Sequence, residues 1–287
     1  MFFENCNNKE KKMRQYLNVL DKIMGEGVER KGRNGTTKAL WAVQMRFNME
    51  DGFPAVTTKQ LAFKPVRSEL LWFIEGSSND NRLKELNGSD KTIWTANAEA
   101  EYWKPKAKFE GDLGRVYGVQ WRDWKTPNGK SIDQLTKVIE NIKYNPSDRR
   151  HVVTAWNPGE IDQMALPPCH MLYQFFVSEG KLSIHMMQRS CDMFLGVPFN
   201  IASYSLLLHM IAQVTNLKAH ECVITLNDAH IYEDHYEQVK IQLQREPYDL
   251  PTLWLNPEVK NIGDFTMDDI ELRNYKFHPK IEAPMAV

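Results

Sequence analysis

Apolar and polar positions alternate with clear periods along most of this 287-residue chain. Apolar residues three and four positions apart predict amphipathic helices, which bury one face against a core. One longer run is apolar on nearly all sides and therefore predicts a buried central helix. The expected helices are residues 13–24, 66–74, 132–142 and 236–245, with 201–217 as the central one.

Strict alternation of apolar and polar residues predicts a half-buried strand over residues 43–49. Residues 151–156 and 222–226 also favour strands. Residues 29–38 carry four cations among turn-forming residues, so they predict a loop that either cradles an anion or is simply solvated. Residues 111–122 indicate a glycine-punctuated turn that enters a strand.

Residues 164–190 predict a β-hairpin, because two β-rich runs meet at the pair Glu179 and Gly180. If these two residues form the turn, the register can be followed along both strands. It places Cys169 opposite Ser190 and beside Arg189.

A thiol beside a guanidinium is expected to have a lowered pKa, which suits a nucleophile. The alternative for Cys169 is a buried small hydrophobe, as most intracellular cysteines are. His170 follows directly in the sequence, but neighbouring residues on a strand point to opposite faces. We therefore do not expect Cys169 and His170 to form a nucleophile–base pair.

Composition narrows the classes of function. The net charge of −1 gives no general basic field for nucleic acid, so any anion site must be local. The four cysteines lack metal-ligand spacing and favour free thiols in a reducing compartment. We see no apolar run long enough to cross a bilayer and no signal-peptide order, which predicts a cytoplasmic protein, or one of the host cytoplasm if the chain is virus-encoded. Without repeats or linkers, one domain over residues 13–287 is expected, after a flexible lead-in over residues 1–12.

Two further features suggest chemistry but have ordinary readings as well. Glu69 lies among bulky apolar residues of a predicted helix, so it is either solvent-facing or partly buried with a raised pKa suited to proton transfer. Arg149 and Arg150 leave a turn together, which suits a phosphate and is also common on ordinary surfaces.

Taken in order, several strings make the chain resemble the thymidylate synthase family over nearly its whole length. A lone Pro-Cys-His would be weak, but an ordered set of long strings is not plausibly chance. The strings are DGFPAVTTK at 51–59, ELLWF at 69–73, MALPPCH at 164–170, QRS at 188–190 and PFNIASY at 198–204.

The resemblance implies an α+β fold with a large mixed β-sheet flanked by helices, and a homodimer whose sheets pack back to back. It implies dUMP and 5,10-methylenetetrahydrofolate as substrates, with no metal and no need for DNA or a membrane. Addition of the Cys169 thiolate to C6 of the uracil would turn C5 into a nucleophile toward the folate's one-carbon unit.

For dUMP, the resemblance implies a phosphate held by arginines, two of them donated by the partner subunit. Asn200 would read the pyrimidine edge, because an amide both donates and accepts. The implied dUMP residues are Arg33, Arg189, Ser190, Asn200, His230 and Tyr232, with Arg149 and Arg150 from the other subunit.

For catalysis and the folate, the resemblance implies that Glu69 relays protons through water and that Tyr117 assists at the thiol. Asp192 would serve both catalysis and folate binding, and the C-terminus would close over the complex and exclude water. The implied folate residues are Lys59, Trp94, Asp192, Leu195, Gly196, Phe199, Ala286 and Val287.

Departures from the family's pattern leave the last step open. The phosphate loop reads RNGTTK over residues 33–38, Thr95 replaces an Asp after Trp94, Asn227 replaces a Gly and Arg115 a Pro. The methylene intermediate can take hydride, giving dTMP and dihydrofolate, or water, giving 5-hydroxymethyl-dUMP. We favour reductive methylation. A non-catalytic nucleotide- or RNA-binding regulator would have no need of the thiolate.

Overall fold

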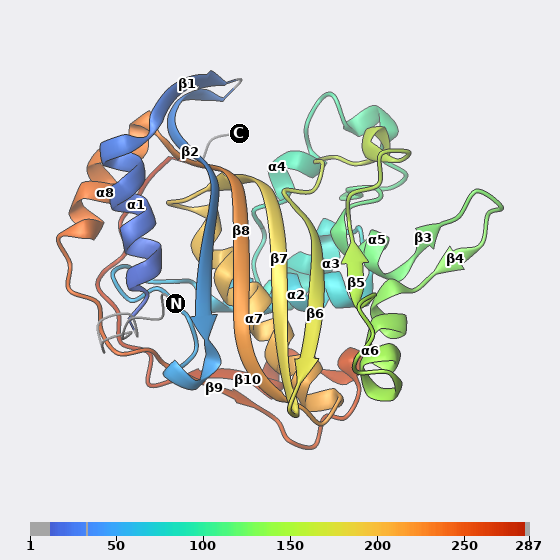
Figure 1. Cartoon of the computed structure of the whole chain (residues 1–287). Helices are drawn as coiled ribbons and strands as arrows, with labels where there is room; N and C mark the ends of the chain where they lie inside the picture. Colours follow the sequence, from blue (N-terminus) through green and yellow to red (C-terminus); the bar gives the residue numbers. More distant parts are fainter. Residues whose placement is uncertain (1–11, 33, 285–287) are drawn as a thin grey trace.

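The computed structural model describes residues 12–32 and 34–284. The chain forms one mixed six-stranded sheet with helices packed mainly on one face (Figure 1). The strand order is β1-β2-β8-β7-β6-β5, and β7 and β8 are the parallel pair. The sheet strands are β1 (Val28–Gly32), β2 (Gly35–Asn48), β5 (Val152–Thr154), β6 (His170–Ser178), β7 (Lys181–Asp192) and β8 (Lys218–Tyr232). The expected α+β fold with a large mixed sheet is confirmed.

The central helix α7 lies behind the sheet in Figure 1 and packs on β7 and β8. The helix α2 packs on α7, and α1 and α8 flank the β2 side of the sheet. The helices are α1 (Arg14–Glu26), α2 (Phe63–Glu75), α3 (Asp80–Asn87), α4 (Thr95–Ala98), α5 (Tyr117–Arg122), α6 (Gln134–Tyr144), α7 (Gly196–Val214) and α8 (Tyr236–Leu243). Two small ribbons complete the fold: β3 (Trp124–Lys125) with β4 (Ser131–Ile132), and β9 (Thr252–Leu255) with β10 (Ile270–Arg273).

The helix α7 is the buried central helix that its apolar sequence predicts, although it begins at Gly196 rather than at residue 201. By length and composition alone it could cross a membrane, so our expectation that no run is long enough was wrong. The helix lies in the core, with 78% of its most apolar window buried inside the protein. Core helices of soluble proteins pass the same test, so the feature is weak evidence for a membrane.

Two segments differ from their predicted structure. Residues 29–32 and 35–38 belong to the paired strands β1 and β2, in which Gly32 pairs with Gly35, and not to an irregular loop. Residues 117–122 form α5 and not a strand. Long-range packing explains the helix, because Tyr117 and Trp121 both lie against Phe73 of α2. Tertiary contacts of this kind override local pattern.

The predicted hairpin is β6 and β7, with Glu179 and Gly180 in the turn. Both residues have positive φ, 50° and 72°, as tight hairpin turns require. Near the Cys169 end, however, a β-bulge between His170 and Leu172 shifts the register by one residue. His170 therefore pairs with Gln188, and the predicted pairing of Cys169 with Ser190 was wrong.

Candidate active site

Strand direction brings the candidate residues to one edge of the sheet. Strands β7 and β8 are parallel, so their ends at Asp192 and Tyr232 lie at the same edge. Strand β6 runs antiparallel to β7, so its beginning, directly after Cys169, lies there too. The first turn of α7 follows β7 at this edge. The start of β6, directly after Cys169, and the end of β8 at Tyr232 thus lie at the same edge although they are far apart in the sequence.

Cys169 is the partly exposed one of the three cysteines that the structure describes. Cys191 and Cys222 are buried, and burial raises the pKa of both thiols. Both are therefore inert small hydrophobes in the core. Cys169 is the thiol that a ligand can reach.

Arg189 is fixed beside Cys169 by its backbone and by its side chain. The Arg189 N–H donates to the Cys169 carbonyl at 2.8 Å. Its guanidinium donates to the carbonyls of Pro168 and Pro167 at 2.9 and 3.0 Å, and lies over the Trp156 ring at 5.4 Å. The two prolines have no N–H of their own, so this segment presents carbonyls that hold the arginine.

The pKa of the Cys169 thiol is raised, because its burial outweighs the lowering effects of Arg189 and Tyr117. Our expectation of a lowered pKa was therefore wrong in direction, although Arg189 does act as expected. The thiol is protonated at neutral pH in the free protein. Attack on a ligand thus requires the proton to leave as the ligand binds.

Tyr117 links the thiol to the rest of the site. Its hydroxyl accepts the Cys169 N–H at 2.6 Å, and its ring stacks on Phe73 at 5.0 Å. Tyr117 has a φ of 20°, unusual for a residue other than glycine, at the start of α5. Such strained positions concentrate at functional sites. Burial raises the pKa of Tyr117 well above its usual range, so the hydroxyl is neutral.

His170 does not serve the thiol. Its Nδ1 is 2.8 Å from the Tyr204 hydroxyl, and its ring packs on Tyr117 at 4.2 Å. Burial lowers the pKa of His170 to about 3, so it is neutral at physiological pH. A neutral, aromatic-packed imidazole is a structural element here, in agreement with the alternation argument.

Gln188 orients the Asn200 amide, a role that the sequence analysis did not assign to it. Its Nε2 donates to the Asn200 Oδ1 at 3.1 Å and to the Ser190 carbonyl at 3.0 Å. Because the Asn200 oxygen accepts this bond, the orientation of its amide is defined. The signal was in the sequence, since Gln188 and Ser190 share one face of a strand.

Asp192, His230 and Tyr232 meet at the ends of β7 and β8. Asp192 pairs with His230 across the parallel strands, and the rings of His230 and Tyr232 are 5.1 Å apart. The Asp192 carboxylate accepts the backbone N–H groups of Phe194 and Leu195 at 2.9 and 3.0 Å. It therefore caps the turn that leads into α7 and holds it beside the site.

Glu69 and Trp94 form the second half of the site. The Trp94 indole N–H donates to the Glu69 Oε1 at 2.7 Å, and the Trp94 ring meets Tyr117 edge-on at 5.7 Å. Burial raises the pKa of Glu69 to about 7, although the Trp94 hydrogen bond lowers it in part. Glu69 is thus partly buried with a raised pKa, which suits proton transfer, and is not a solvent-facing helical residue.

Residues predicted for the folate lie around the start of α7. Phe199 lines a cavity of about 220 Å³ together with Glu69 and Ile93. Lys59 is buried, donates to the Phe194 carbonyl at 2.5 Å and lies 3.7 Å from the Phe194 ring. Burial lowers the pKa of Lys59 to about 8, against a raising effect of Asp192.

Some predicted residues are not placed at this site. Arg33, Ala286 and Val287 lie outside the described residues. Pro284, where the described chain ends, has its carbonyl 2.7 Å from the Nε2 of the buried His235.

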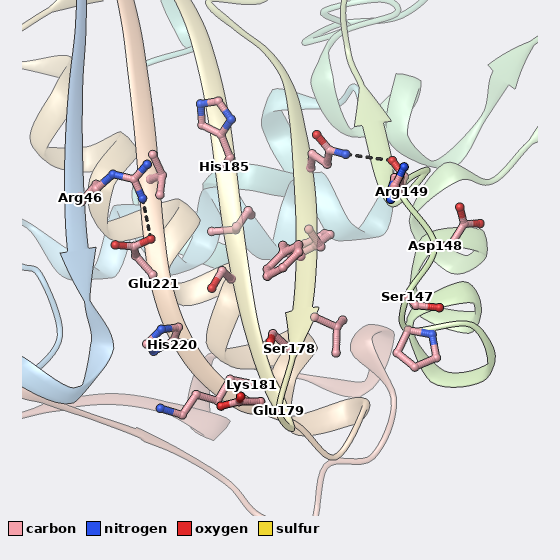
Figure 2. Close-up of a pocket in the computed structure, with 18 residues that line it drawn as sticks. Arg46, Ser147, Asp148, Arg149, Ser178, Glu179, Lys181, His185, His220 and Glu221 are labelled. Atoms are coloured by element: carbon pink, nitrogen blue, oxygen red, sulfur yellow. Dashed lines mark hydrogen bonds and ion pairs between the residues drawn. The ribbon is translucent and has the colours of Figure 1, made fainter. Parts of the chain in front are cut away.

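Arg149 lies at the open face of the sheet, and Arg150 is the next residue in the chain. The Arg149 carbonyl accepts the Gln174 side chain at 2.9 Å, and Arg150 pairs with Asp148. In Figure 2, Arg149 borders a hollow over β6, β7 and β8 on this face. The Arg150 side chain is 88% exposed, although its guanidinium is held by Asp148.

The departures have structural roles. Arg115 donates to Glu160 and Asp123, and so ties the segment before α5 to two other loops. Asn227 is an internal residue of β8. Thr95 turns its hydroxyl away from the pocket, to Asp80. All three substitutions leave the geometry around Cys169 and Glu69 assembled.

A comparison with protein families agrees with this geometry. The family model described as "Thymidylate synthase" matches residues 14–287. The match spans nearly the whole chain, including every described residue of the site.

Proposed function

Because this chain belongs to the thymidylate synthase family, we propose that it methylates dUMP reductively, with 5,10-methylenetetrahydrofolate as the one-carbon donor. The products are dTMP and dihydrofolate. The observation that carries the proposal is the connected group of Cys169, Tyr117, Trp94 and Glu69. This connection of Cys169 through Tyr117 and Trp94 to Glu69 supports the proposal, because the thiol would act as nucleophile and the carboxyl would transfer protons.

The first step is covalent. The Cys169 sulfur forms a bond to C6 of the uracil as its proton leaves, and the C5–C6 double bond opens toward an enolate at O4. Arg189 and Ser190 hold the phosphate and so aim C6 at the sulfur. Arg189 is pre-positioned for this by the carbonyls of Pro167 and Pro168.

Uracil recognition rests on Asn200. Its amide donates to O4 and accepts from N3–H, with its orientation supported by Gln188. An Asp at this position would suit cytosine better, because cytosine presents an amino donor in place of O4. His230 and Tyr232, at the C-terminal end of β8, bind the ribose hydroxyl.

The remaining steps need proton transfer and a dry pocket. The enolate carbon C5 attacks the folate's one-carbon unit, and Glu69 relays the protons through water, at a pKa of about 7 that suits both protonation states. Loss of the C5 proton and of tetrahydrofolate leaves an exocyclic methylene. Hydride from that tetrahydrofolate reduces the methylene as Cys169 departs, which gives dTMP and dihydrofolate.

The burial of Trp94 supports reduction of the exocyclic methylene by hydride, and not addition of water to it, at the last step. Trp94 is buried and its indole N–H is already occupied by Glu69, so it presents an apolar surface to the methylene. The Thr95 hydroxyl, which could otherwise hold a water there, is bound to Asp80 at 2.8 Å. A shielded methylene takes hydride more readily than water.

Product analysis tests the proposal directly. The protein is incubated with dUMP and 5,10-methylenetetrahydrofolate. The mass of the nucleotide product is measured by mass spectrometry, and the formation of dihydrofolate is followed by absorbance. We expect dTMP and dihydrofolate in equal amounts. A product of the mass of 5-hydroxymethyl-dUMP without dihydrofolate would establish the hydroxymethylase instead. No turnover and no Cys169 adduct would favour a binding regulator.

We further propose a homodimer that packs the open sheet faces together. Helices leave this face bare in Figure 1, and it carries Phe176 with 68% of its surface exposed. Such an exposed aromatic next to charged residues is typical of an interface. Arg149 borders the hollow on this face and Arg150 follows it in the chain, so we propose that both reach the phosphate site of the partner.

Subunit complementation tests this arrangement. A Cys169→Ser subunit and a subunit with Arg149→Ala and Arg150→Ala are each expected to be nearly inactive. Mixed after unfolding and refolding, they should regain about a quarter of wild-type activity, because half of the dimers are mixed and each has one intact site. If the arginines served their own subunit, mixing would restore nothing.

A further inference from the structure

Asp80, at the first residue of α3, is a fully buried carboxylate outside the residues assigned above. Its two oxygens are occupied by different partners. Oδ1 accepts the Thr92 hydroxyl at 2.5 Å, and Oδ2 accepts the Thr95 hydroxyl at 2.8 Å. Lys84 Nζ lies 3.0 Å from Oδ2 and supplies the compensating charge. A buried carboxylate is costly unless it is paired and hydrogen-bonded in this way.

The two threonine hydroxyls also hold the backbone of the turn between them. The Thr95 oxygen accepts the Thr92 N–H at 3.0 Å, and the Thr92 oxygen accepts the Trp94 N–H at 3.0 Å. A hydroxyl has one proton to donate, and both threonines give theirs to Asp80. Their lone pairs are thereby directed at the backbone. Asp80 therefore orients both threonine hydroxyls of this turn.

The turn carries Trp94 and sets where its ring lies. The indole packs against Trp72 at 5.8 Å and Tyr117 at 5.7 Å, and its N–H reaches Glu69. Glu69 also faces the phenols of Tyr117 and Tyr204, and Lys91 lines the same cavity. Of these groups, Trp94 is the one that donates a hydrogen bond to the Glu69 carboxylate, at 2.7 Å.

We infer that Asp80 and Thr95 are positioning residues, which hold Trp94 so that its indole N–H stays on Glu69 during the reaction. The inference rests on the proposed function for the role of Glu69, and it assigns a purpose to the Thr that follows Trp94. The Thr95 substitution is then a working part of the site. The family's Asp after the tryptophan is replaced by Thr95, whose hydroxyl donates a hydrogen bond to the buried Asp80 carboxylate.

The test compares Thr95→Val, which keeps the shape and removes the hydroxyl, with Thr95→Ser, which keeps the hydroxyl. The readout is the titration of Glu69 itself, followed by NMR on protein with ¹³C-labelled glutamate and assigned by its loss in Glu69→Gln. The Trp94 bond favours the ionised form, so losing it raises the Glu69 midpoint. We expect Thr95→Val to raise it by about half a pH unit or more, and Thr95→Ser to match the wild type.

A double-mutant cycle separates positioning from general loosening. Trp94→Phe should raise the midpoint as Thr95→Val does, and the combined variant should equal Trp94→Phe alone. Should Thr95→Val not fold, Asp80→Asn carries the same comparison, since an amide keeps the volume but cannot accept from both hydroxyls. In turnover assays these variants should lower kcat while the KM for dUMP stays within about twofold.

A wild-type Glu69 midpoint in Thr95→Val and in Asp80→Asn would overturn the inference, even if both variants were less stable. So would an added shift in the double variant. The titration needs no substrate, so it gives its answer whether or not dUMP is turned over. Failure of the proposed function would show in the product analysis alone.

Discussion

A Cys169→Ser variant is expected to lose about 10⁴-fold or more in kcat, equivalent to about 5 kcal/mol of activation free energy. Serine has nearly the same shape, so the contacts of the Cys169 backbone with Tyr117 and Arg189 should remain. A hydroxyl is far less acidic and less nucleophilic than a thiol, so no adduct forms at C6. dUMP should still bind, because the anchors of its phosphate are unchanged.

Mass spectrometry of the denatured complex with 5-fluoro-dUMP and 5,10-methylenetetrahydrofolate measures this directly. The wild type should carry a covalent adduct on the peptide that contains Cys169, and Cys169→Ser none. Cys222→Ala is the matched control, since Cys222 is a core residue of β8 and should leave the adduct intact. An adduct at another residue, or turnover by Cys169→Ser, would refute the mechanism.

A Glu69→Gln variant is expected to lose about 10²–10⁴-fold in kcat, the usual contribution of a proton-transfer group. Glutamine can still accept the Trp94 N–H, so the site keeps its shape, but it cannot exchange a proton. The inflection near pH 7 in the wild-type pH profile of kcat/KM should be absent in the variant. Glu85→Gln, an exposed position on α3, should stay within about twofold of the wild type and serves as the control.

The same variant should be more stable than the wild type at neutral and alkaline pH. The pKa of Glu69 is raised on folding, so between about pH 4.5 and 7 the folded state binds more protons than the unfolded state. Wild-type stability therefore falls as pH rises through this window, and the penalty is complete above it. Glutamine has no such penalty, and the expected gain at pH 8 is about 2–3 kcal/mol.

Urea unfolding at pH 5 and pH 8 tests the sign. The gain in the free energy of unfolding of Glu69→Gln over the wild type should be larger at pH 8 than at pH 5. An equal gain at both values would mean that Glu69 is not held neutral by its surroundings. A variant that is more stable and less active shows the conflict between a functional buried carboxyl and a stable core.

Local patterns were enough for elements whose own side chains decide them. The β6–β7 hairpin follows from Glu179 and Gly180, because few residues tolerate the positive φ of a tight turn. The central helix follows from a run that is apolar on all sides. The family was identified because an ordered set of strings spans the chain, whereas the roles of Cys169, Arg189 and Glu69 remain proposals.

Other features depended on contacts between distant segments. The bulge at the start of β6 shifted Cys169 by one residue relative to Ser190, and no local pattern marks a bulge. Tyr117 starts a helix because it stacks on Phe73, and not because of its neighbours in sequence. The two cations of β1 lie on a strand because that segment pairs with β2.

The sequence by itself determined the family and the mixed sheet with its buried helix, since these depend on residue type and spacing. It also named the groups that we propose take part in the reaction. Only the tertiary structure decided their states. Burial raised the pKa of the Cys169 thiol, although the charge of Arg189 lowers it in part. Burial also raised the pKa of Glu69 to about 7. A pKa reflects the balance of desolvation and nearby charges. That balance exists only once segments as distant as Asp80, Trp94 and Cys169 have been brought to their places around one pocket.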